Sequence, residues 1–312
     1  MPDHLAASPE AVAARPPLAV WLQACRVRSL AISSVAVLVG GGVALAERHW
    51  SGRLVLAWLG AVALQAGTNL TNVYHNYKAT RAGTFDPRGS SAVIRAGLLP
   101  ADAVRRAGLA CFAAGVACGA VLAALAGWPI LAVGIPGLLA GYFYAAPPVR
   151  LAYAALGVVT VFLCMGPAMV VGSYYAVTLH ASAGAAAASV PVGLLAAAIM
   201  HTNDLRDHDT DVAFGKRTLA TLLGPRGARG LLVAMLGAAY AGTIAAVALG
   251  ALPWPVLLVG ATAPHAVALG RAATRAASAA ELNAAWSLGV RLFTEFGVAM
   301  VAGLGVAALL PR

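Results

Sequence analysis

The sequence has little charge of either sign and very few acidic residues. Only 10% of its 312 residues are charged, and Asp and Glu account for 11 of them against 21 Lys and Arg. Soluble domains carry about 25% charged residues, so this composition excludes an ordinary soluble domain. Because 61% of the residues are hydrophobic, the chain is long and apolar enough for many bilayer crossings. We therefore predict an all-α integral membrane protein.

Cysteine is also scarce, and the four cysteines form no CxxC pair. No zinc site or disulfide framework is indicated. The first residues contain no basic cluster followed directly by a short apolar core, so they do not resemble a cleaved signal peptide. We expect residues 1–20 to form a polar, disordered tail and residues 21–312 to form a single transmembrane domain.

Long apolar segments make up most of the remaining chain. A spanning helix needs about 20 mostly apolar residues. The sequence predicts nine transmembrane helices, and Pro136 interrupts the shortest of them. Abundant glycine, with 34 residues, suits close helix packing in lipid. The predicted helices lie near residues 28–46, 54–77, 104–127, 129–146, 151–178, 189–205, 230–250, 252–271 and 286–309.

The basic residues are distributed unevenly between the two sides of these predicted helices. With an internal N-terminus, all of the 21 Lys and Arg except Arg48, Arg53 and Arg312 fall on one side. The positive-inside rule then places the N-terminus and the polar loops in the cytoplasm. We expect a multi-pass protein of the inner (plasma) membrane. Because topology explains the net charge of +10, no nucleic acid partner is implied, and no protein partner either.

Four of the 11 carboxylates lie within eight residues at the end of the sixth predicted helix. On a continuous helix Asp204, Asp207 and Asp211 would lie within about 60° of one another, whereas Asp209 would point away. Three carboxylates on one face repel unless a cation lies among them. A solvated helix end is one interpretation. The stronger one is a set of hard oxygen ligands for Mg²⁺, which would bridge to a substrate phosphate.

A weak internal repeat pairs this acidic segment with an earlier one. The offset that aligns Asn72 with Asn203 also aligns Asn76 with Asp207 and Thr80 with Asp211. Both predicted helices run in the same direction through the membrane, so we expect their polar ends to face each other at one cavity. The first copy offers amide and hydroxyl oxygens without negative charge.

The acidic segment Asn203–Asp211, followed by GKRTLA, resembles the second aspartate motif of the UbiA superfamily of membrane prenyltransferases. Other segments occur in the order of that family: RVRSL from Arg26, GTNLTNVYHNYK (67–78), YAAPPVRLAY (144–153) and GPAMVVGSYYAVT (166–178). They most resemble the 1,4-dihydroxy-2-naphthoate polyprenyltransferase branch. The family fold has nine transmembrane helices around a central cavity.

The resemblance implies Mg²⁺-dependent transfer of a prenyl group from an allylic prenyl diphosphate to an aromatic or other small acceptor, as in menaquinone-like biosynthesis. By resemblance, Asn203, Asp207 and Asp211 bind the metal, with Asp204 assisting catalysis. The basic residues have an alternative role as positive-inside anchors, and the tyrosines as packing residues. The residues implied to contact substrate are Asn72, Asn76, Lys78, Arg150, Arg206, Lys216 and Arg217, with Tyr144, Tyr153, Tyr174 and Tyr175 lining the cavity.

Three positions depart from the family pattern. Val73 and Asn76 stand where the first motif carries acids, and Val158 stands where the naphthoate branch has Glu. Asp86 is the only carboxylate near the first motif, and its register is wrong. Three hypotheses follow: a transferase whose acceptor differs from dihydroxynaphthoate, a membrane terpene cyclase of the same family, and a non-catalytic binder of isoprenoid lipids.

A few polar residues lie inside predicted helices. His75 is a candidate general base for the acceptor proton, because its unperturbed pKa is near neutrality; the alternative is a structural hydrogen bond. Arg291 and Glu295 are four residues apart in the ninth predicted helix, which predicts a local ion pair of structural importance. The sequence indicates no role for His201 and His265.

Overall fold

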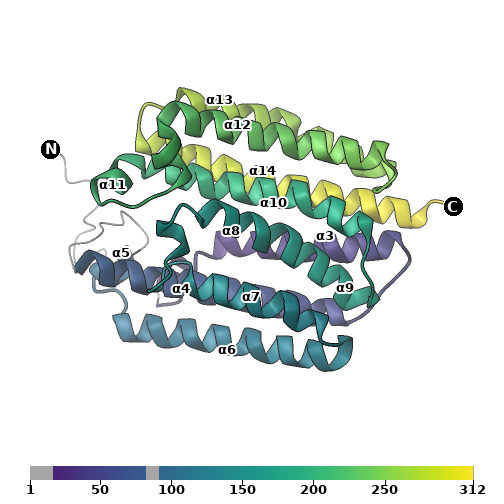
Figure 1. The fold of residues 1–312 in the computed structure, drawn as a ribbon, viewed down its shortest axis with the longest axis horizontal. Helices are drawn as coiled ribbons and strands as arrows, with labels where there is room; N and C mark the ends of the chain where they lie inside the picture. Colours follow the sequence, from purple (N-terminus) through teal and green to yellow (C-terminus); the bar gives the residue numbers. More distant parts are fainter. Residues whose placement is uncertain (1–16, 82–90, 312) are drawn as a thin grey trace.

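The computed structural model describes residues 17–81 and 91–311, and their helices lie side by side in one bundle (Figure 1). Among these residues, eight helical segments are long and apolar enough to cross a membrane. They are α3 (Val27–Ala46), α4 (Arg53–Arg81), α6 (Ala101–Ala126), α8–η2–α9 (Gly157–Leu163, Cys164–Val171, Gly172–Thr178), α10 (Ala183–Arg206), α12 (Leu219–Ala248), η3–α13 (Trp254–Thr262, Ala263–Arg275) and α14 (Ala279–Leu309).

The predicted count of nine spanning helices is not confirmed. Each predicted segment has a counterpart in the predicted order, but the fourth is α7 (Pro129–Phe143), which has only 15 residues. At 1.5 Å per residue, α7 is about 22 Å long and falls short of the hydrocarbon core. The fifth begins at Gly157 rather than near residue 151, because the short helix η1 (Leu151–Tyr153) and a turn precede it.

The start of the chain is ordered earlier than predicted. Residues 1–16 of the expected polar tail lie outside the described residues. Helix α2 (Pro17–Ala24) includes the last four residues of that tail, and Val20 is buried in a small core with residues of α4, α5 (Ala92–Arg95) and α6. Helix α2 therefore overlaps the last four residues of the expected tail, where the apolar side chain of Val20 has packing partners.

Glycine allows several helices to approach closely, as the composition predicted. A Cβ added to Gly166 in η2 would lie 2.5 Å from the Ser189 carbonyl oxygen of α10. A Cβ added to Gly115 in α6 would lie 2.6 Å from Leu64 of α4. The backbone contact at Gly166 is too short for any larger residue, whereas a larger residue at Gly115 would require the Leu64 side chain to move. Dispersion contacts between closely packed backbones stabilise such pairs where lipid provides no hydrophobic driving force.

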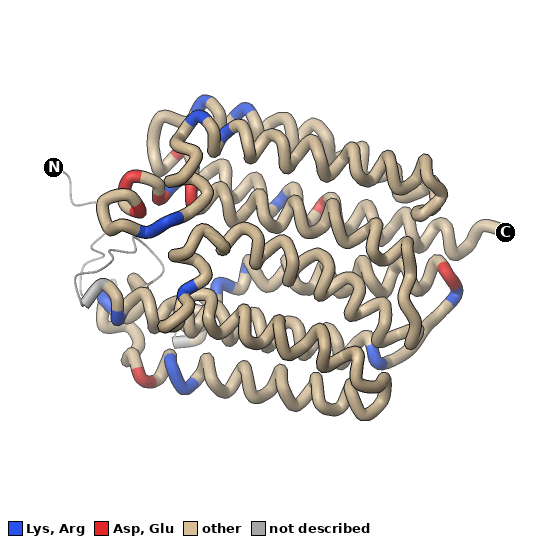
Figure 2. Tube along the Cα trace, viewed as in Figure 1, with Lys and Arg blue, Asp and Glu red and all other residues tan. Residues whose placement is uncertain are grey.

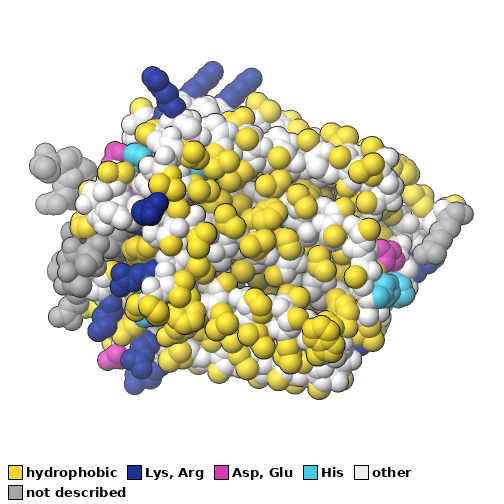
Figure 3. All heavy atoms as spheres, in the orientation of Figure 1, with side chains coloured by type: hydrophobic (Ala, Val, Ile, Leu, Met, Phe, Trp, Pro, Cys, Tyr) yellow, Lys and Arg dark blue, Asp and Glu magenta, His cyan; other side chains and the backbone are white. Residues whose placement is uncertain are grey.

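The bundle has one strongly charged end. Lys and Arg are concentrated at the end formed by α5 and by α11 (His208–Ala213), and fewer lie at the opposite end (Figure 2). Between the two ends the visible surface is mostly hydrophobic (Figure 3). This surface and the apolar helices identify a multi-pass membrane protein. We call the end that contains α5 and α11 the polar end.

Candidate active site

A cavity of about 350 Å³ lies inside the bundle between α3, α4, α6, α7, η2 and α10. Small and apolar residues such as Gly60, Gly119, Leu122 and Ile130 line most of it. The π-helix η2 contains Pro167, whose ring interrupts regular α-helical hydrogen bonding, and it presents consecutive turns to the cavity. The polar residues of its lining include Arg26, Asn72, Asn76, Tyr144, Tyr153, Asn203, Arg206, Asp207 and Lys216.

The acidic segment is not one continuous helix. Helix α10 ends at Arg206, Asp207 adopts φ −93° and ψ 5°, and α11 begins at His208. Hydrogen bonds nevertheless run from Asp207 N to Asn203 O at 3.0 Å and from Asp211 N to Asp207 O at 2.8 Å. Helical spacing is thus retained across the junction, and only the direction of the chain changes.

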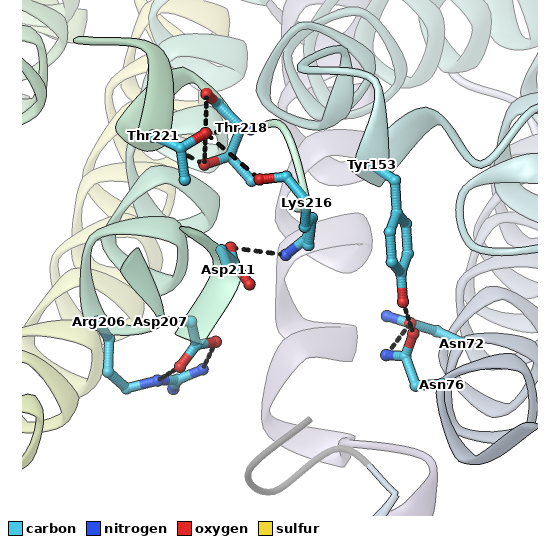
Figure 4. Close-up of polar contacts among 9 residues, drawn as sticks. All are labelled: Asn72, Asn76, Tyr153, Arg206, Asp207, Asp211, Lys216, Thr218 and Thr221. Carbon is cyan, nitrogen blue, oxygen red and sulfur yellow. Dashed lines mark hydrogen bonds and ion pairs between the residues drawn. The ribbon is translucent and has the colours of Figure 1, made fainter. Parts of the chain in front are cut away.

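The carboxylates of this segment have different surroundings. Asp204 is 3% exposed. Asp207 accepts two hydrogen bonds from Arg206, at 2.8 and 2.7 Å (Figure 4). The Asp209 side chain is fully exposed beside His208, which confirms the prediction that it points away from the others. Three of the four acids are therefore held at or beneath the cavity wall.

Asp211 is the most deeply buried of these acids. Its side chain is 0% exposed, and Lys216 donates a hydrogen bond of 2.9 Å to Oδ2. Oδ1 has no hydrogen-bond partner among the described residues. Burial raises the pKa of the Asp211 carboxyl, and the positive charge of Lys216 opposes that rise. An acceptor oxygen buried without a donor is available to a cation.

The loop after α11 brings Lys216 to the cavity. Ala155 N donates to Arg217 O at 2.8 Å, and Arg217 N donates to Tyr153 O at 3.3 Å. The side chain and main chain of Thr218 form a capping box with Thr221 at the start of α12 (Figure 4). These contacts fix the loop, and Lys216 Nζ lies 5.7 Å from the centroid of the Tyr153 ring.

The asparagines of the first repeat copy lie across the cavity from the acidic segment (Figure 4). Asn76 donates through Nδ2 to Asn72 Oδ1 at 2.7 Å. The Tyr153 hydroxyl donates to Asn76 Oδ1, also at 2.7 Å. The prediction that both polar helix ends face one cavity is therefore confirmed.

Several predicted site residues lie elsewhere. Tyr174 is fully buried at the opposite end of the bundle, where its hydroxyl donates to Glu47. The half-buried His75 ring packs edge-on against Tyr74 and Tyr142, with centroid separations of 5.1 and 6.4 Å. Neither residue lines the cavity.

The remaining predicted residues fall into two groups. The side chains of Lys78 and Arg217 are exposed and do not line the cavity. Arg150 does not line the cavity either, but its guanidinium carbon lies 5.6 Å from the ring centroid of Tyr153, which does. Tyr144 is buried at the cavity wall, and its hydroxyl has no hydrogen-bond partner among the described residues. Burial raises the pKa of Tyr144, so its hydroxyl remains protonated.

Arg26 is a cavity residue that sequence reasoning did not select. It adopts a left-handed conformation, φ 51°, between α2 and α3, and this turn directs it to the cavity wall near Arg206 and Asp207. Burial, followed by the positive charge of Arg206, lowers the pKa of the Arg26 guanidinium. The available signal was its position at the start of the RVRSL segment.

Two of the three positions that depart from the family pattern are occupied by packing residues. Val73 and Val158 are 1% and 3% exposed, each within a hydrophobic core. Thr80 and Asp86 lie outside the residues whose side chains the structure describes. A carboxylate at either valine would be buried without a partner nearby unless the surroundings changed. Among the described residues of the two polar segments, only the second copy supplies acids to the cavity.

We tested whether the residues present fit Mg²⁺. Within residues 17–81 and 91–311, no three His, Cys, Asp or Glu side chains are arranged as a ready metal site. The donor types are suitable, because Asn203 and Asp207 offer oxygen atoms at the cavity wall and Asp211 Oδ1 is buried without a donor. To bind the metal, the carboxylates of Asp207 and Asp211 would have to turn partly away from Arg206 and Lys216, with which they are paired in this structure.

Comparison with known proteins agrees with this geometry. The model of the UbiA prenyltransferase family matches residues 33–293. The 1,4-dihydroxy-2-naphthoate octaprenyltransferase of Bacillus subtilis (strain 168) is 31% identical over 237 residues, which cover 75% of this chain and 76% of that relative. The protein of the same name from Mycobacterium tuberculosis (strain ATCC 25618 / H37Rv) is 32% identical over 243 residues, covering 77% and 81%.

Solved structures show the same fold at lower identity. The apo structure of a UbiA homolog from Aeropyrum pernix K1 has a TM-score of 0.66 and 22% identity, covering 87% of this chain and 97% of that one. A UbiA homolog from Archaeoglobus fulgidus bound to GPP and Mg²⁺ has a TM-score of 0.59 and 18% identity, covering 91% and 99%.

Proposed function

The chain belongs to the UbiA prenyltransferase family, and we propose that it transfers a prenyl group from an allylic diphosphate to an aromatic acceptor at the polar end of the cavity. The observation that carries this proposal is one cavity with a charged polar end and a long apolar remainder. A polyprenyl diphosphate has the same division between an anionic head and an apolar tail.

The diphosphate head would lie between the two repeat copies. Lys216 and Arg206 supply positive charge from one side, and the Asn72 and Asn76 amides supply neutral donors from the other. We propose that Mg²⁺ is held by oxygen atoms of Asn203, Asp207 and Asp211, with Asp204 adding negative charge beneath them. When bound, the metal would neutralise charge on the leaving diphosphate.

The reaction requires separation of opposite charges. The bond between the allylic carbon and the diphosphate oxygen breaks, and its electron pair leaves with the diphosphate. Cationic side chains stabilise this leaving group, while the apolar lining keeps water from the allylic cation. A ring carbon of the acceptor then donates an electron pair to form the new bond, and the acceptor loses a proton.

A second cavity, of about 590 Å³, is the proposed site of acceptor entry. It shares Arg26, Asn203, Arg206 and Trp286 with the first cavity. The Trp286 indole nitrogen is buried without a hydrogen-bond partner in the described part of the chain. A flat acceptor with an acidic group would find an aromatic surface, a donor and a buried guanidinium there. The naphthoate acceptors named for two relatives have this chemistry.

We further propose that the polar end faces the cytoplasm of a cell whose plasma membrane holds the protein. Apart from Arg291, which lies within α14, the sequence puts all of the 21 basic residues except Arg48, Arg53 and Arg312 on the side of the N-terminus and the acidic segment. This asymmetry supports the orientation through the positive-inside rule.

The test is incubation of purified protein in lipid nanodiscs with Mg²⁺ and labelled prenyl diphosphates of several chain lengths. Each is assayed with 1,4-dihydroxy-2-naphthoate, with other aromatic acids, and without acceptor. We expect prenylated product only when an aromatic acceptor is present. Asp207→Ala should remove turnover.

Other outcomes would select another hypothesis. A hydrocarbon formed without acceptor would support the terpene cyclase. Absence of diphosphate release with every chain length would contradict both enzymes and support a lipid binder. Product from other aromatic acids but not from dihydroxynaphthoate would support the prediction, based on Val158, that the acceptor differs.

A further inference from the structure

A charged group lies on the outside of the bundle, away from both cavities. Glu295 Oε1 accepts a hydrogen bond of 2.7 Å from Arg291 Nε, which confirms the predicted local ion pair. Glu295 Oε2 lies 2.5 Å from His265 Nδ1 on α13. The side chains of Arg291, His265 and Glu295 are 62%, 42% and 30% exposed. We call these three residues the ionisable triad.

The triad lies within the depth of the hydrocarbon layer. Asn283, near the start of α14, accepts a hydrogen bond from Arg206 and marks the polar end. Arg291 is eight residues further along, which is about 12 Å at 1.5 Å per residue. Glu295 is about 22 Å from Leu310, which accepts a bond from Arg48 at the other end. Figure 2 shows one blue and one red segment midway along the bundle, far from the charge at its ends.

The helices on this side of the bundle each expose apolar side chains. Val298 on α14, Val267 on α13 and Ile244 on α12 are 61%, 50% and 58% exposed. An ionic group exposed to lipid at this depth is unfavourable, and ionisable residues in membranes normally face protein or water. Ionic side chains exposed at this depth need a polar or charged protein partner, because lipid tails offer no such groups.

The direction of the Arg291 side chain excludes the possibility that its charge is solvated by lipid headgroups. A lone arginine in a membrane extends towards the nearer headgroups. Arg291 instead reaches towards Glu295, which lies one turn further from the polar end. Its two terminal nitrogen groups make no hydrogen bond with the described residues, so donors remain available at the surface. Lipid headgroups do not reach this depth.

We propose that this face of α13 and α14 is the interface between two copies of the chain. A twofold axis along the membrane normal would place both triads at the same depth. Arg291 of each copy would then donate to the partner's Glu295, which gives four charges of alternating sign. A single surface that carries both signs is complementary to itself, as an isologous interface requires. A different protein partner would have to carry a positive and a negative charge at the same depth in the membrane.

The first test uses cysteine cross-linking in native-like membranes. Val298→Cys lies one helical repeat of seven residues from Arg291 on α14, and it leaves the triad intact. Val116→Cys on α6, across the bundle from α13 in Figure 1, is the matched control because Val116 is 49% exposed. The wild-type chain, with its four native cysteines, is the blank. We expect a covalent dimer at least tenfold more abundant for Val298→Cys than for Val116→Cys.

The second test measures oligomeric state by single-molecule photobleaching in vesicles. We expect dimers for the wild type, at least a tenfold loss of dimer for Arg291→Leu/Glu295→Leu, and retention for the exchanged pair Arg291→Glu/Glu295→Arg. A monomeric wild type at every protein-to-lipid ratio would overturn the proposal. So would equal cross-linking of the two cysteine variants, or a double leucine variant as dimeric as the wild type. If a triad variant fails to fold, the cross-linking comparison decides alone.

Discussion

The hydroxyl of Tyr153 donates a 2.7 Å hydrogen bond to Oδ1 of Asn76, and thereby joins segments 77 residues apart in the sequence. Asn76 donates in turn to Asn72, and Lys216 Nζ lies 5.7 Å from the centroid of the same tyrosine ring. One tyrosine therefore connects the neutral amides of α4 with the cationic loop after α11. In the proposed complex, these groups surround the diphosphate.

Tyr153→Phe should weaken prenyl diphosphate binding while preserving the ring beneath Lys216. Loss of one hydrogen bond, worth about 0.5–1.5 kcal/mol, predicts a rise in KM of about 2- to 10-fold. Steady-state kinetics with varied prenyl diphosphate measures the change. Tyr240→Phe is the control, because its hydroxyl bonds to Thr262 away from the cavity. An unchanged KM for Tyr153→Phe would contradict the assigned role.

Asp211→Asn should lower kcat by about 100-fold or more, because it removes negative charge from the proposed metal site but keeps the shape of the side chain. Activity at increasing Mg²⁺ concentrations measures the effect, and the variant should need more metal. Asp209→Asn offers a matched control on the same short helix, since Asp209 is fully exposed. Equal losses in the two variants would show that the segment acts only through its total charge.

Lys216→Gln and Arg217→Gln should differ in their effect on activity, although the family resemblance implies the same substrate-binding role for both residues. Lys216 lines the cavity, whereas the exposed Arg217 contributes backbone hydrogen bonds that glutamine can retain. We expect a tenfold or greater loss of kcat/KM for Lys216→Gln and less than a twofold change for Arg217→Gln. The measured quantity is product formation at limiting prenyl diphosphate. A larger loss for Arg217→Gln would show that the loop moves when substrate binds.

Tyr174→Phe should reduce stability rather than catalysis. Tyr174 and Ser182 both donate to Glu47, and these bonds connect the end of α3 with α9 and the start of α10. Glu47 is half-buried, and loss of this hydrogen bond costs about 0.5–1.5 kcal/mol, so Tm in detergent should fall. Thermal unfolding is the measurement. Tyr175→Phe, which loses a 3.3 Å bond to Ala126 O, is the control. A large fall in kcat at unchanged Tm would return Tyr174 to the active site.

Helix order and the opposition of the two polar segments were predictable because each depends on local sequence. Runs of apolar residues must be helical in lipid, and Asn72 and Asn203 stand at equivalent ends of parallel helices. The break at Asp207 was not predictable, because helix periodicity contains no information on where the chain changes direction. The sequence identified the α7 segment as the shortest predicted helix, but not that it has only 15 residues, since apolar composition does not set the length of a helix.

Side-chain direction separates what the sequence determined from what the tertiary structure decided. Composition and motif order by themselves determined a membrane prenyltransferase of the UbiA family with its acids at one helix end. Whether Lys216 or Arg217 enters the cavity depends on the backbone contacts with Tyr153 and Ala155, which are distant in sequence. Arg26 reaches the site only through a left-handed turn. Such contacts form when distant segments pack together, so no local pattern could reveal them.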